Sequence, residues 1–301
     1  MYDIVIIGAG PAGITAAVYA ARKKMDLLVV TGDIGGQAAW SGDIENYTGY
    51  QFISGPELAS KFEEHMRTYQ IAVKENETVI SVLKEKETIL VKSNKEEYPS
   101  RTLIIASGKR TRQLGVPGEN EFKNRGLTYC ATCDGPLFAK KDVAVIGGGN
   151  SALDAALQLL RIATHVYVIN NTPALGGDAI MRQKVQEASN VTVYNDSQVT
   201  AVRGDRMVNA LTMQRRGKEE TLAVGGVFVE IGLVPNSEFA AIVEKNQNGE
   251  IKIDCHNQTS VPGIFAAGDV TDVPEKQIII AAGEGSKACL CAFRYLSQHV
   301  F

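Results

Sequence analysis

Short apolar runs that end at a glycine recur along the chain, and they predict buried parallel strands. Residues 4–7 form the first run and Gly8 ends it; an alanine-rich segment at 12–24 follows, and residues 27–30 form a second apolar run. Uninterrupted apolar runs are typical of strands that are covered on both faces, and the segment between them has the length of a helix. The order predicts a strand–helix–strand unit with parallel strands.

The second half of the chain repeats this pattern, and segments of alternating apolar and polar residues separate the repeats. Residues 143–146 and 166–169 are apolar runs on either side of an expected helix at 151–162. Alternation with a period of two is typical of half-buried strands and predicts antiparallel meanders. The other expected elements are a helix at 58–69, a meander at 78–83, 87–92 and 96–98, a buried strand at 103–106, a second meander at 191–194, 198–203, 208–215 and 221–230, a buried strand at 264–267 and a last helix at 277–297.

Two segments that contain glycine and proline, 115–118 and 232–236, predict linkers. They bracket the second βαβ unit, so the last strand and helix belong with the first. We expect an α/β fold with two Rossmann-like three-layer βαβ domains, the second inserted into the first. The predicted boundaries are 1–112 plus 237–301 for the first domain and 113–236 for the inserted domain.

Composition and charge exclude several classes of protein. A length of 301 residues agrees with two domains, and 45% hydrophobic with 22% charged residues exclude a disordered chain. The formal net charge is −3 and no basic run exceeds Arg22-Lys23-Lys24, which argues against a nucleic-acid partner. No signal peptide is expected, and no apolar stretch approaches the ~20 residues of a membrane span. We expect a cytoplasmic protein without a membrane partner.

The segment Gly8-Ala9-Gly10-Pro11-Ala12-Gly13 has the spacing G-x-G-x-x-G between a predicted strand and a predicted helix. Missing side chains let a pyrophosphate approach the backbone at the positive end of the helix. The context predicts a dinucleotide site, with a structural turn as the alternative. The acidic residue that holds a ribose in such sites is absent, since Thr31 and Gly32 follow the second strand, with Asp33 behind them.

A second loop, Gly147-Gly148-Gly149-Asn150-Ser151-Ala152, has the spacing G-x-G-x-x-A in the same context. An acid after the next strand would hold the ribose of NAD, and arginines would hold the phosphate of NADP. The residues there, Asn170-Asn171-Thr172 and then Gly176, are neither acidic nor basic. A fold that is kept without its ligand is the favoured interpretation of this loop, with nicotinamide binding as the alternative.

Cys130-Ala131-Thr132-Cys133-Asp134 is a C-x-x-C motif followed by an acid, which indicates a redox dithiol. A zinc site would need a second pair of ligands, but Cys289 and Cys291 are separated by only one residue and the four histidines are scattered, so no metal is expected. Asp134 is a candidate proton donor or acceptor, or else a turn residue. The three other cysteines, Cys255, Cys289 and Cys291, are expected to be structural.

Together these motifs resemble the low-molecular-weight thioredoxin reductase family. The resemblance covers essentially the whole chain and includes Gly35-Gly36-Gln37, the C-x-x-C-D segment with Gly135, and Gly263-Ile264-Phe265-Ala266-Ala267-Gly268-Asp269-Val270. It implies an FAD domain split around the inserted domain, a Cys130–Cys133 redox disulfide, thioredoxin as a partner and a homodimer. The FAD contacts that it implies are Gly8, Gly10, Pro11, Ala12, Gly13, Thr31, Gly32, Gly35, Gly36, Gln37, Asn46, Ala106, Ser107, Gly108, Gly268, Asp269, Lys276, Gln277 and Ile278.

The chain departs from the NADPH-using members of this family, which carry a His-Arg-Arg motif where Asn170, Asn171 and Thr172 stand. Charge-assisted contacts to a 2′-phosphate are therefore missing. The chain is similar in this respect to the branch that takes electrons from reduced ferredoxin, which we expect as the donor. Candidate docking cations are Arg22-Lys23-Lys24, or Lys109 and Arg110 with Arg112, although a solvated surface explains each of them alone.

By this resemblance Cys133 faces the flavin, Cys130 attacks the disulfide of thioredoxin, Asp134 supplies a proton, and a hinge rotation occurs at the linkers. Three alternatives stay open: a reductase that uses NADH or NADPH, a dithiol oxidase that passes electrons to oxygen, and a non-catalytic protein that binds flavin. The aromatic C-terminus, Phe301, either covers the flavin or frays from the last helix.

Overall fold

The structure, a computed structural model, describes residues 1–41, 43, 44 and 46–298, with the backbone alone for Asp43 and Cys133. Phe301 lies outside these residues. The chain divides into two compact units: unit 1 is Met1–Arg110 with Val234–Phe301, and unit 2 is Thr111–Leu233. Each unit combines a parallel sheet core with helices, so the predicted α/β fold is confirmed. Which cofactor each unit binds stays a prediction.

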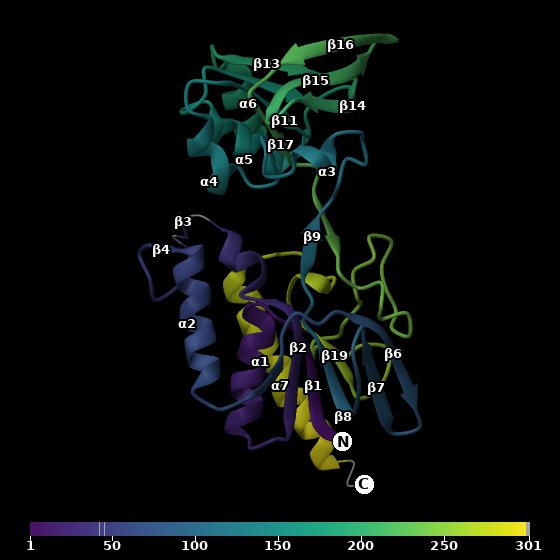
Figure 1. Ribbon diagram of the computed structural model, residues 1–301. Helices are drawn as coiled ribbons and strands as arrows, with labels where there is room; N and C mark the ends of the chain where they lie inside the picture. Colours follow the sequence, from purple (N-terminus) through teal and green to yellow (C-terminus); the bar gives the residue numbers. More distant parts are fainter. Residues whose placement is uncertain (42, 45, 299–301) are drawn as a thin grey trace. The chain divides into compact units, whose positions relative to one another are not determined.

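Unit 1 is built on a seven-stranded sheet in the order β5-β2-β1-β8-β7-β6, with β19 also paired to β8 (Figure 1). The central strand β1 (Tyr2–Ala9) runs parallel to β2 and β8, and α1 (Pro11–Arg22) connects β1 to β2. The other bounds are β2 (Leu27–Ile34), β5 (Ala72–Lys74), β6 (Val79–Glu85), β7 (Thr88–Ser93), β8 (Glu97–Ile105), β19 (Ile264–Ala266), α2 (Gly55–Arg67) and α7 (Ile278–Gln298).

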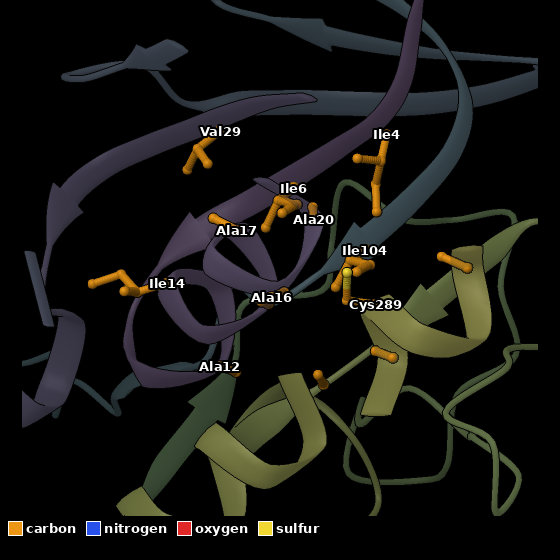
Figure 2. Packing of buried hydrophobic residues seen from close by; sticks show 14 of the residues in the cluster. Ile4, Ile6, Ala12, Ile14, Ala16, Ala17, Ala20, Val29, Ile104 and Cys289 are labelled. Atoms are coloured by element: carbon orange, nitrogen blue, oxygen red, sulfur yellow. The ribbon is translucent and has the colours of Figure 1, made fainter. Parts of the chain in front are cut away.

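Residues 4–7 of strand β1 are all apolar because both faces of the strand are covered. Ile4 and Ile6 pack with α1 and α7 in one cluster, whereas Val5 and Ile7 pack in another with β6, β7 and residues 240–251. Alanines on the inner side of α1 bring this helix close to the sheet, as Figure 2 shows for Ala16, Ala17 and Ala20. This close packing fixes where α1 begins, and with it the position of the first glycine loop.

The structure separates the three cysteines outside the C-x-x-C motif. Cys289 and Cys291 are buried in the cluster between α1 and α7, where Figure 2 shows Cys289 beside Ile104. Burial raises the pKa of Cys289 to about 12, so this thiol stays protonated. Cys255, in contrast, is exposed. The expectation of a structural role is therefore wrong for Cys255, because an exposed thiol fills no space in a core.

Unit 2 has a five-stranded parallel sheet in the order β10-β17-β11-β12-β13 and a separate three-stranded antiparallel sheet, β14-β15-β16 (Figure 1). Val143 and Val145 of β11 pack under the helices, and Ala144 and Ile146 pack against the antiparallel sheet. The bounds are β10 (Leu127–Thr128), β11 (Asp142–Ile146), β12 (His165–Ile169), β13 (Val191–Tyr194), β14 (Ser197–Gly204), β15 (Val208–Arg215), β16 (Lys218–Ala223), β17 (Gly226–Val229), α3 (Glu119–Phe122), α4 (Ala131–Asp134), α5 (Asn150–Leu159) and α6 (Ala179–Glu187).

Several predicted elements differ in the structure. Strand β8 is continuous, so the segments predicted at 96–98 and 103–106 belong to one strand that pairs first with β7 and then with β1. The segment predicted at 221–230 is divided at 224–225 into β16 and β17, which belong to different sheets. Residues 191–194 form an edge of the parallel sheet and not a meander strand. Helix α6 was not predicted.

Two short strands, β9 (Lys109–Thr111) and β18 (Leu233–Pro235), pair where the chain enters and leaves unit 2. The predicted linker at 115–118 is held by buried Glu119, whose carboxylate accepts the backbone N–H groups of Leu114 and Gly115 at 2.6 and 2.7 Å. Within the described residues no helix has the length and apolar character needed to span a bilayer. The remaining elements are β3 (Asp43–Ile44), β4 (Ile53–Ser54), η1 (Gly36–Trp40), η2 (Gly135–Phe138) and η3 (Gly268–Val270).

Candidate functional site

The first glycine loop lies between β1 and α1, and two of its glycines are required by backbone contacts. A Cβ on Gly8 would lie 2.4 Å from the carbonyl oxygen of Ala106, and one on Gly13 would lie 1.9 Å from that of Gly8. A Cβ on Gly10 would meet no atom closer than 4.0 Å. Helix α1 begins after Gly10 without a side-chain cap. The loop therefore leaves open space at the uncapped, positive end of α1, where a pyrophosphate fits.

The carboxyl ends of four strands of unit 1 bring the predicted contacts together. The Gly35 N–H donates to the Ala9 carbonyl at 2.8 Å. A Cβ on Gly36 would lie 3.3 Å from the Cα of Gly10. A Cβ on Gly268, after β19, would lie 3.0 Å from Ala12. In open parallel sheets, ligands bind in the crevice outside these strand ends. Ala12, Gly35, Gly36, Ala106 and Gly268 are placed together in this way, while Pro11 is the first residue of α1 and Gly108 follows two residues after Ala106.

Asp269 follows Gly268 and carries a carboxylate for which the described residues supply no hydrogen bond. Burial raises its pKa, and the charges of Lys276 and Lys109 oppose that rise. Buried Glu284 of α7 accepts the backbone N–H of Gly268 at 2.8 Å and so fixes the turn. A desolvated carboxylate without an internal partner fits a ligand that offers hydroxyl groups. The residues present therefore fit the ribityl and pyrophosphate parts of FAD.

Near Asp269 lies an ion-paired cluster that the sequence did not indicate. Glu250 contacts Lys109 at 2.7 Å and Lys276 at 3.3 Å, and these three side chains are 11–21% exposed. Burial alone would raise the pKa of Glu250, but hydrogen bonds from Lys109 and Asn246 and the charge of Lys276 outweigh it and bring the pKa to about 2. Glu250 therefore fixes Lys276 just before α7 begins.

The other predicted cofactor residues of unit 1 have mixed environments. Thr31 is buried and accepts the Ala9 N–H at 3.2 Å, while Gly32 is exposed. The Gln37 amide donates to the Lys109 carbonyl at 2.9 Å. The Asn46 side-chain amide donates to the side-chain oxygen of Gln277 at 3.0 Å. The Ser107 hydroxyl donates to the Asn236 carbonyl at 2.6 Å. Ile278 is the first residue of α7.

Unit 2 has a cavity of about 740 Å³ over the second glycine loop. This volume lies within the range of about 300–1,000 Å³ that is typical of ligand pockets. Helix α5 begins after Gly149 without a side-chain cap, so its positive end is open. The lining comes entirely from unit 2, and its members include Arg112, Gly147, Gly148, Gly149, Asn150, Asn170, Asn171, Thr172, Gly176, Gln198 and Glu230.

The segment after β12 has no charge but is firmly ordered. Buried Asn170 donates to Asn195 at 2.9 Å and to the Thr172 carbonyl at 3.0 Å, and a Cβ on Gly148 would lie 2.3 Å from its amide oxygen. The Asn150 side chain accepts the N–H of Asp178 at 2.7 Å. Among the lining residues that the structure describes, Arg112 and Glu230 alone are charged. The loop predicted to have lost its ligand therefore retains an open and preorganised cavity.

The C-x-x-C motif also lies in unit 2, at the start of α4. Cys130 is disulfide-bonded, and its N–H donates to the Thr128 hydroxyl at 3.2 Å. The same hydroxyl donates to the Asp134 carboxylate in a short hydrogen bond. The side chain of Cys133 lies outside the described residues. Asp134 is thereby held beside the segment that carries Cys130, as a proton donor or acceptor at this place requires.

Sequence reasoning missed Glu230, Glu250 and Glu284. Glu284 and Glu230 have a weak signal, since an acid inside an otherwise apolar segment is unusual and indicates a buried partner. Glu250 has no such signal, because it lies in a polar loop. No group of three or more potential metal ligands occurs in the described part of the chain.

Comparisons with known proteins agree with this geometry. The model of the family "Pyridine nucleotide-disulphide oxidoreductase" matches residues 2–285. An "NADH dehydrogenase" of Bacillus subtilis is 45% identical over 99% of this chain and 59% of its own length. An alkyl hydroperoxide reductase protein of Pseudomonas aeruginosa is 42% identical over 98% of this chain and 58% of its own length. The chain thus spans about three fifths of these curated relatives.

Solved structures are similar over nearly the whole chain. Lactococcus lactis thioredoxin reductase has a TM-score of 0.85 and 34% identity, covering 99% of this chain and 100% of its own. A ferredoxin-flavin thioredoxin reductase from Clostridium acetobutylicum has a TM-score of 0.55 and 29% identity, with 99% of each chain covered. The predicted likeness to thioredoxin reductases is confirmed, and the ferredoxin-dependent branch is not supported. The chain belongs to the pyridine nucleotide-disulphide oxidoreductase family.

Proposed function

We propose that the chain is an FAD-dependent disulfide reductase that takes electrons from NADH and passes them, through Cys130 and Cys133, to thioredoxin or a thioredoxin-like protein. The observation that carries the proposal is the cavity of about 740 Å³ over Gly147–Gly149, in the same unit as disulfide-bonded Cys130. An open cavity beside an uncapped helix end is typical of a site that binds a ligand, and is not expected of a loop that has lost its ligand. This reverses the interpretation that the sequence favoured.

Unit 1 would hold FAD, with the pyrophosphate at Gly8, Gly10 and Gly13 and the ribityl hydroxyls at Asp269. FAD held by these residues would supply the two-electron chemistry that connects a hydride donor with the disulfide. Two electrons and two protons convert that disulfide to two thiols. Cys130 would then attack the partner disulfide, Cys133 would resolve the mixed disulfide, and Asp134 would exchange the proton. The similarity to a solved thioredoxin reductase supports thioredoxin as the acceptor.

Neutral residues after β12 support NADH as the donor over NADPH. Asn171 and Thr172 are exposed at the cavity and offer hydrogen bonds to ribose hydroxyls, but no cation for a 2′-phosphate. The relative named NADH dehydrogenase also favours NADH as the donor. Two of the candidate ferredoxin-docking cations are already paired, Lys109 with Glu250 at 2.7 Å and Arg110 with Glu238 at 2.6 Å.

The deciding experiment is anaerobic mixing of the oxidised holoprotein with NADH, NADPH or reduced ferredoxin while flavin absorbance is followed. We expect rapid bleaching by NADH and about tenfold or more slower bleaching by NADPH at equal concentration. Bleaching by ferredoxin alone would contradict the proposed donor and restore the ferredoxin-dependent branch. A double variant, Asn171→Arg with Thr172→Arg, should favour NADPH, whereas Gln186→Arg at an exposed position of α6 should not.

The acceptor is tested separately with Cys130→Ser. This variant should lose thioredoxin reduction and keep flavin reduction by the donor, because the attacking thiol is absent. Cys255→Ser, at an exposed free cysteine, is the matched control and should keep both activities. Full thioredoxin reduction by Cys130→Ser would contradict the proposed route. A homodimer and a cytoplasmic location remain predictions, the first testable by light scattering.

A further inference from the structure

Glu230 connects the cavity of unit 2 with the redox motif. It follows β17, is half-buried and lines the cavity. Its N–H donates to the Ile146 carbonyl at 2.8 Å, and a Cβ on Gly147 would lie 2.2 Å from its carbonyl oxygen. The backbone of Glu230 therefore packs directly against the second glycine loop.

Strand β17 pairs in parallel with β10, with Phe228 opposite Thr128, so Glu230 and Cys130 each come two residues after this pair. A hydrogen bond from the Ala131 backbone N–H acts to lower the pKa of the Glu230 carboxyl. Ala131 is the first residue of α4 and follows Cys130 in the chain. A single side chain thus borders the space that a nucleotide would fill and also contacts the helix that begins at the redox cysteine. Both contacts lie within unit 2, so they form together whatever the position of unit 1.

The surroundings of Glu230 favour its neutral form more than water does. Burial raises the pKa to about 7, the Ala131 N–H opposes this, and the charge of Asp154 on α5 adds to the rise. Arg112 also lines the cavity, and Asp134 lies on α4, where it accepts a hydrogen bond from Thr128. The Glu230 carboxyl group thus changes charge near neutral pH.

We propose that Glu230 is a positioning residue through which occupation of the cavity by a nucleotide controls the reactivity of the Cys130 thiolate. The inference rests on the proposed function, because it takes a nucleotide as the ligand of the cavity. It adds a control of the dithiol that the family membership does not imply.

The physical basis is repulsion between like charges. An ionised Glu230 next to Ala131 disfavours a thiolate on Cys130, and a neutral Glu230 does not. A nucleotide in the cavity would remove water from Glu230, and this loss of water favours the protonated carboxyl, while the pyrophosphate charge would lie at the positive end of α5. Glu230 would then take up one proton from solvent, and Cys130 would lose its thiol proton more readily. Cys130 becomes a better nucleophile when the donor is bound.

The test measures alkylation of Cys130 by iodoacetamide against pH, in a Cys133→Ser, Cys255→Ser background in which Cys130 is the accessible free thiol. Glu230→Gln keeps an oxygen that accepts the Ala131 N–H and removes the charge. We expect this variant to react about three- to tenfold faster than its parent at pH 8 and at the same rate below about pH 6. ADP-ribose, which carries the pyrophosphate but accepts no hydride, should accelerate the parent at pH 8 and leave the Gln variant unchanged.

If Glu230→Gln does not fold, a second variant tests the same proposal. Asp154→Asn removes a charge that holds Glu230 neutral, and its amide oxygen can still accept from Gln158, which donates at 2.8 Å in the native chain. Glu230 should then ionise at lower pH, so the alkylation of Cys130 should begin to slow at lower pH than in the parent. Equal profiles with and without the Glu230 carboxyl, or acceleration by ADP-ribose in the Gln variant, would overturn the proposal.

Equilibrium dialysis separates this inference from the proposed function. If ADP-ribose binds and alkylation of the parent does not respond, the coupling through Glu230 is wrong and the nucleotide site stands. If ADP-ribose does not bind at millimolar concentration, the nucleotide donor itself is contradicted, and the coupling falls with it. The comparison of ligand-free parent and Gln variant still reports whether Glu230 acts on Cys130.

Discussion

Thr128 donates a hydrogen bond to the Asp134 carboxylate while its oxygen accepts the N–H of Cys130. One buried hydroxyl therefore aligns both ends of the C-x-x-C-D segment. Thr128 belongs to β10, which pairs with β17, so the motif is anchored to the parallel sheet and not to a loop. The redox segment follows β10 directly, and Glu230 follows the neighbouring strand β17.

We predict that Thr128→Val slows reduction of thioredoxin about three- to tenfold, because Asp134 loses its donor and the Cys130 N–H loses its acceptor. Single-turnover mixing of the reduced enzyme with oxidised thioredoxin measures this rate. Thr132→Val is the control, since that hydroxyl is exposed and bonds Gln158 at 2.9 Å. Equal slowing in both variants would show that the Thr128 contacts have no special role.

Asp269→Asn should weaken FAD binding about tenfold or more, because an amide replaces the carboxylate that is desolvated without a partner among the described residues. Fluorescence titration of apoprotein with FAD gives the dissociation constant. Asp272→Asn is the matched control, because the Asp272 carboxylate accepts the Ile253 N–H at 3.2 Å and an amide oxygen can accept it as well. Unchanged FAD affinity in Asp269→Asn would remove Asp269 from the site.

Two glycine-to-alanine changes should have opposite effects on the free energy of unfolding. Gly13→Ala should destabilise by about 3 kcal/mol or more, because its Cβ would lie 1.9 Å from the Gly8 carbonyl oxygen, which is backbone and cannot easily move. Gly283→Ala, in open space on α7, should stabilise by about 0.5–1 kcal/mol. Urea unfolding followed by circular dichroism measures both. A mild effect at Gly13 would contradict the packing described for the first loop.

The Glu250 carboxylate should contribute stability that depends on pH. Its pKa is lowered from the ordinary 4.5 to about 2, so the contribution is present above about pH 4.5 and is lost as the pH falls through 2. Glu250→Gln should lower the free energy of unfolding by about 2 kcal/mol at pH 7, and this difference should shrink at pH 3. Glu238→Gln, whose ion pair with Arg110 is more than half exposed, should cost less than about 1 kcal/mol. A loss at Glu250 that is independent of pH would contradict an electrostatic origin.

The strands and helices that the sequence predicted well are those with a local signal. Apolar runs ending at Gly8 and at Gly147 lie in β1 and β11, and the helices after them begin within one residue of their predicted starts. The signal is local because helix and strand periods, glycine and proline act over a few residues. Where strands exchange partners the local signal fails, as in β8, which pairs with an antiparallel strand and then with parallel ones.

The contacts that assemble the sites are distant in the sequence and were not predicted. Glu230 meets Ala131, and Glu284 meets Gly268, only because strands and helices of each unit fold back on one another. The cavity over the second loop was also not predicted, because residue types after β12 report the selectivity of a cavity and not its presence. Asn170, read as a missing acid, is a buried amide that orders the rim of that cavity.

The pairing of β9 with β18 has a consequence for how this chain can be divided. The strand that enters unit 2 and the strand that leaves it are hydrogen-bonded neighbours, and the Arg112 N–H donates to Gly232 at 2.9 Å just inside. The two ends of residues 111–233 therefore lie side by side. Unit 2 can be cut out as a fragment with adjacent termini, and a short turn can join β9 to β18 in what remains, without rethreading either part.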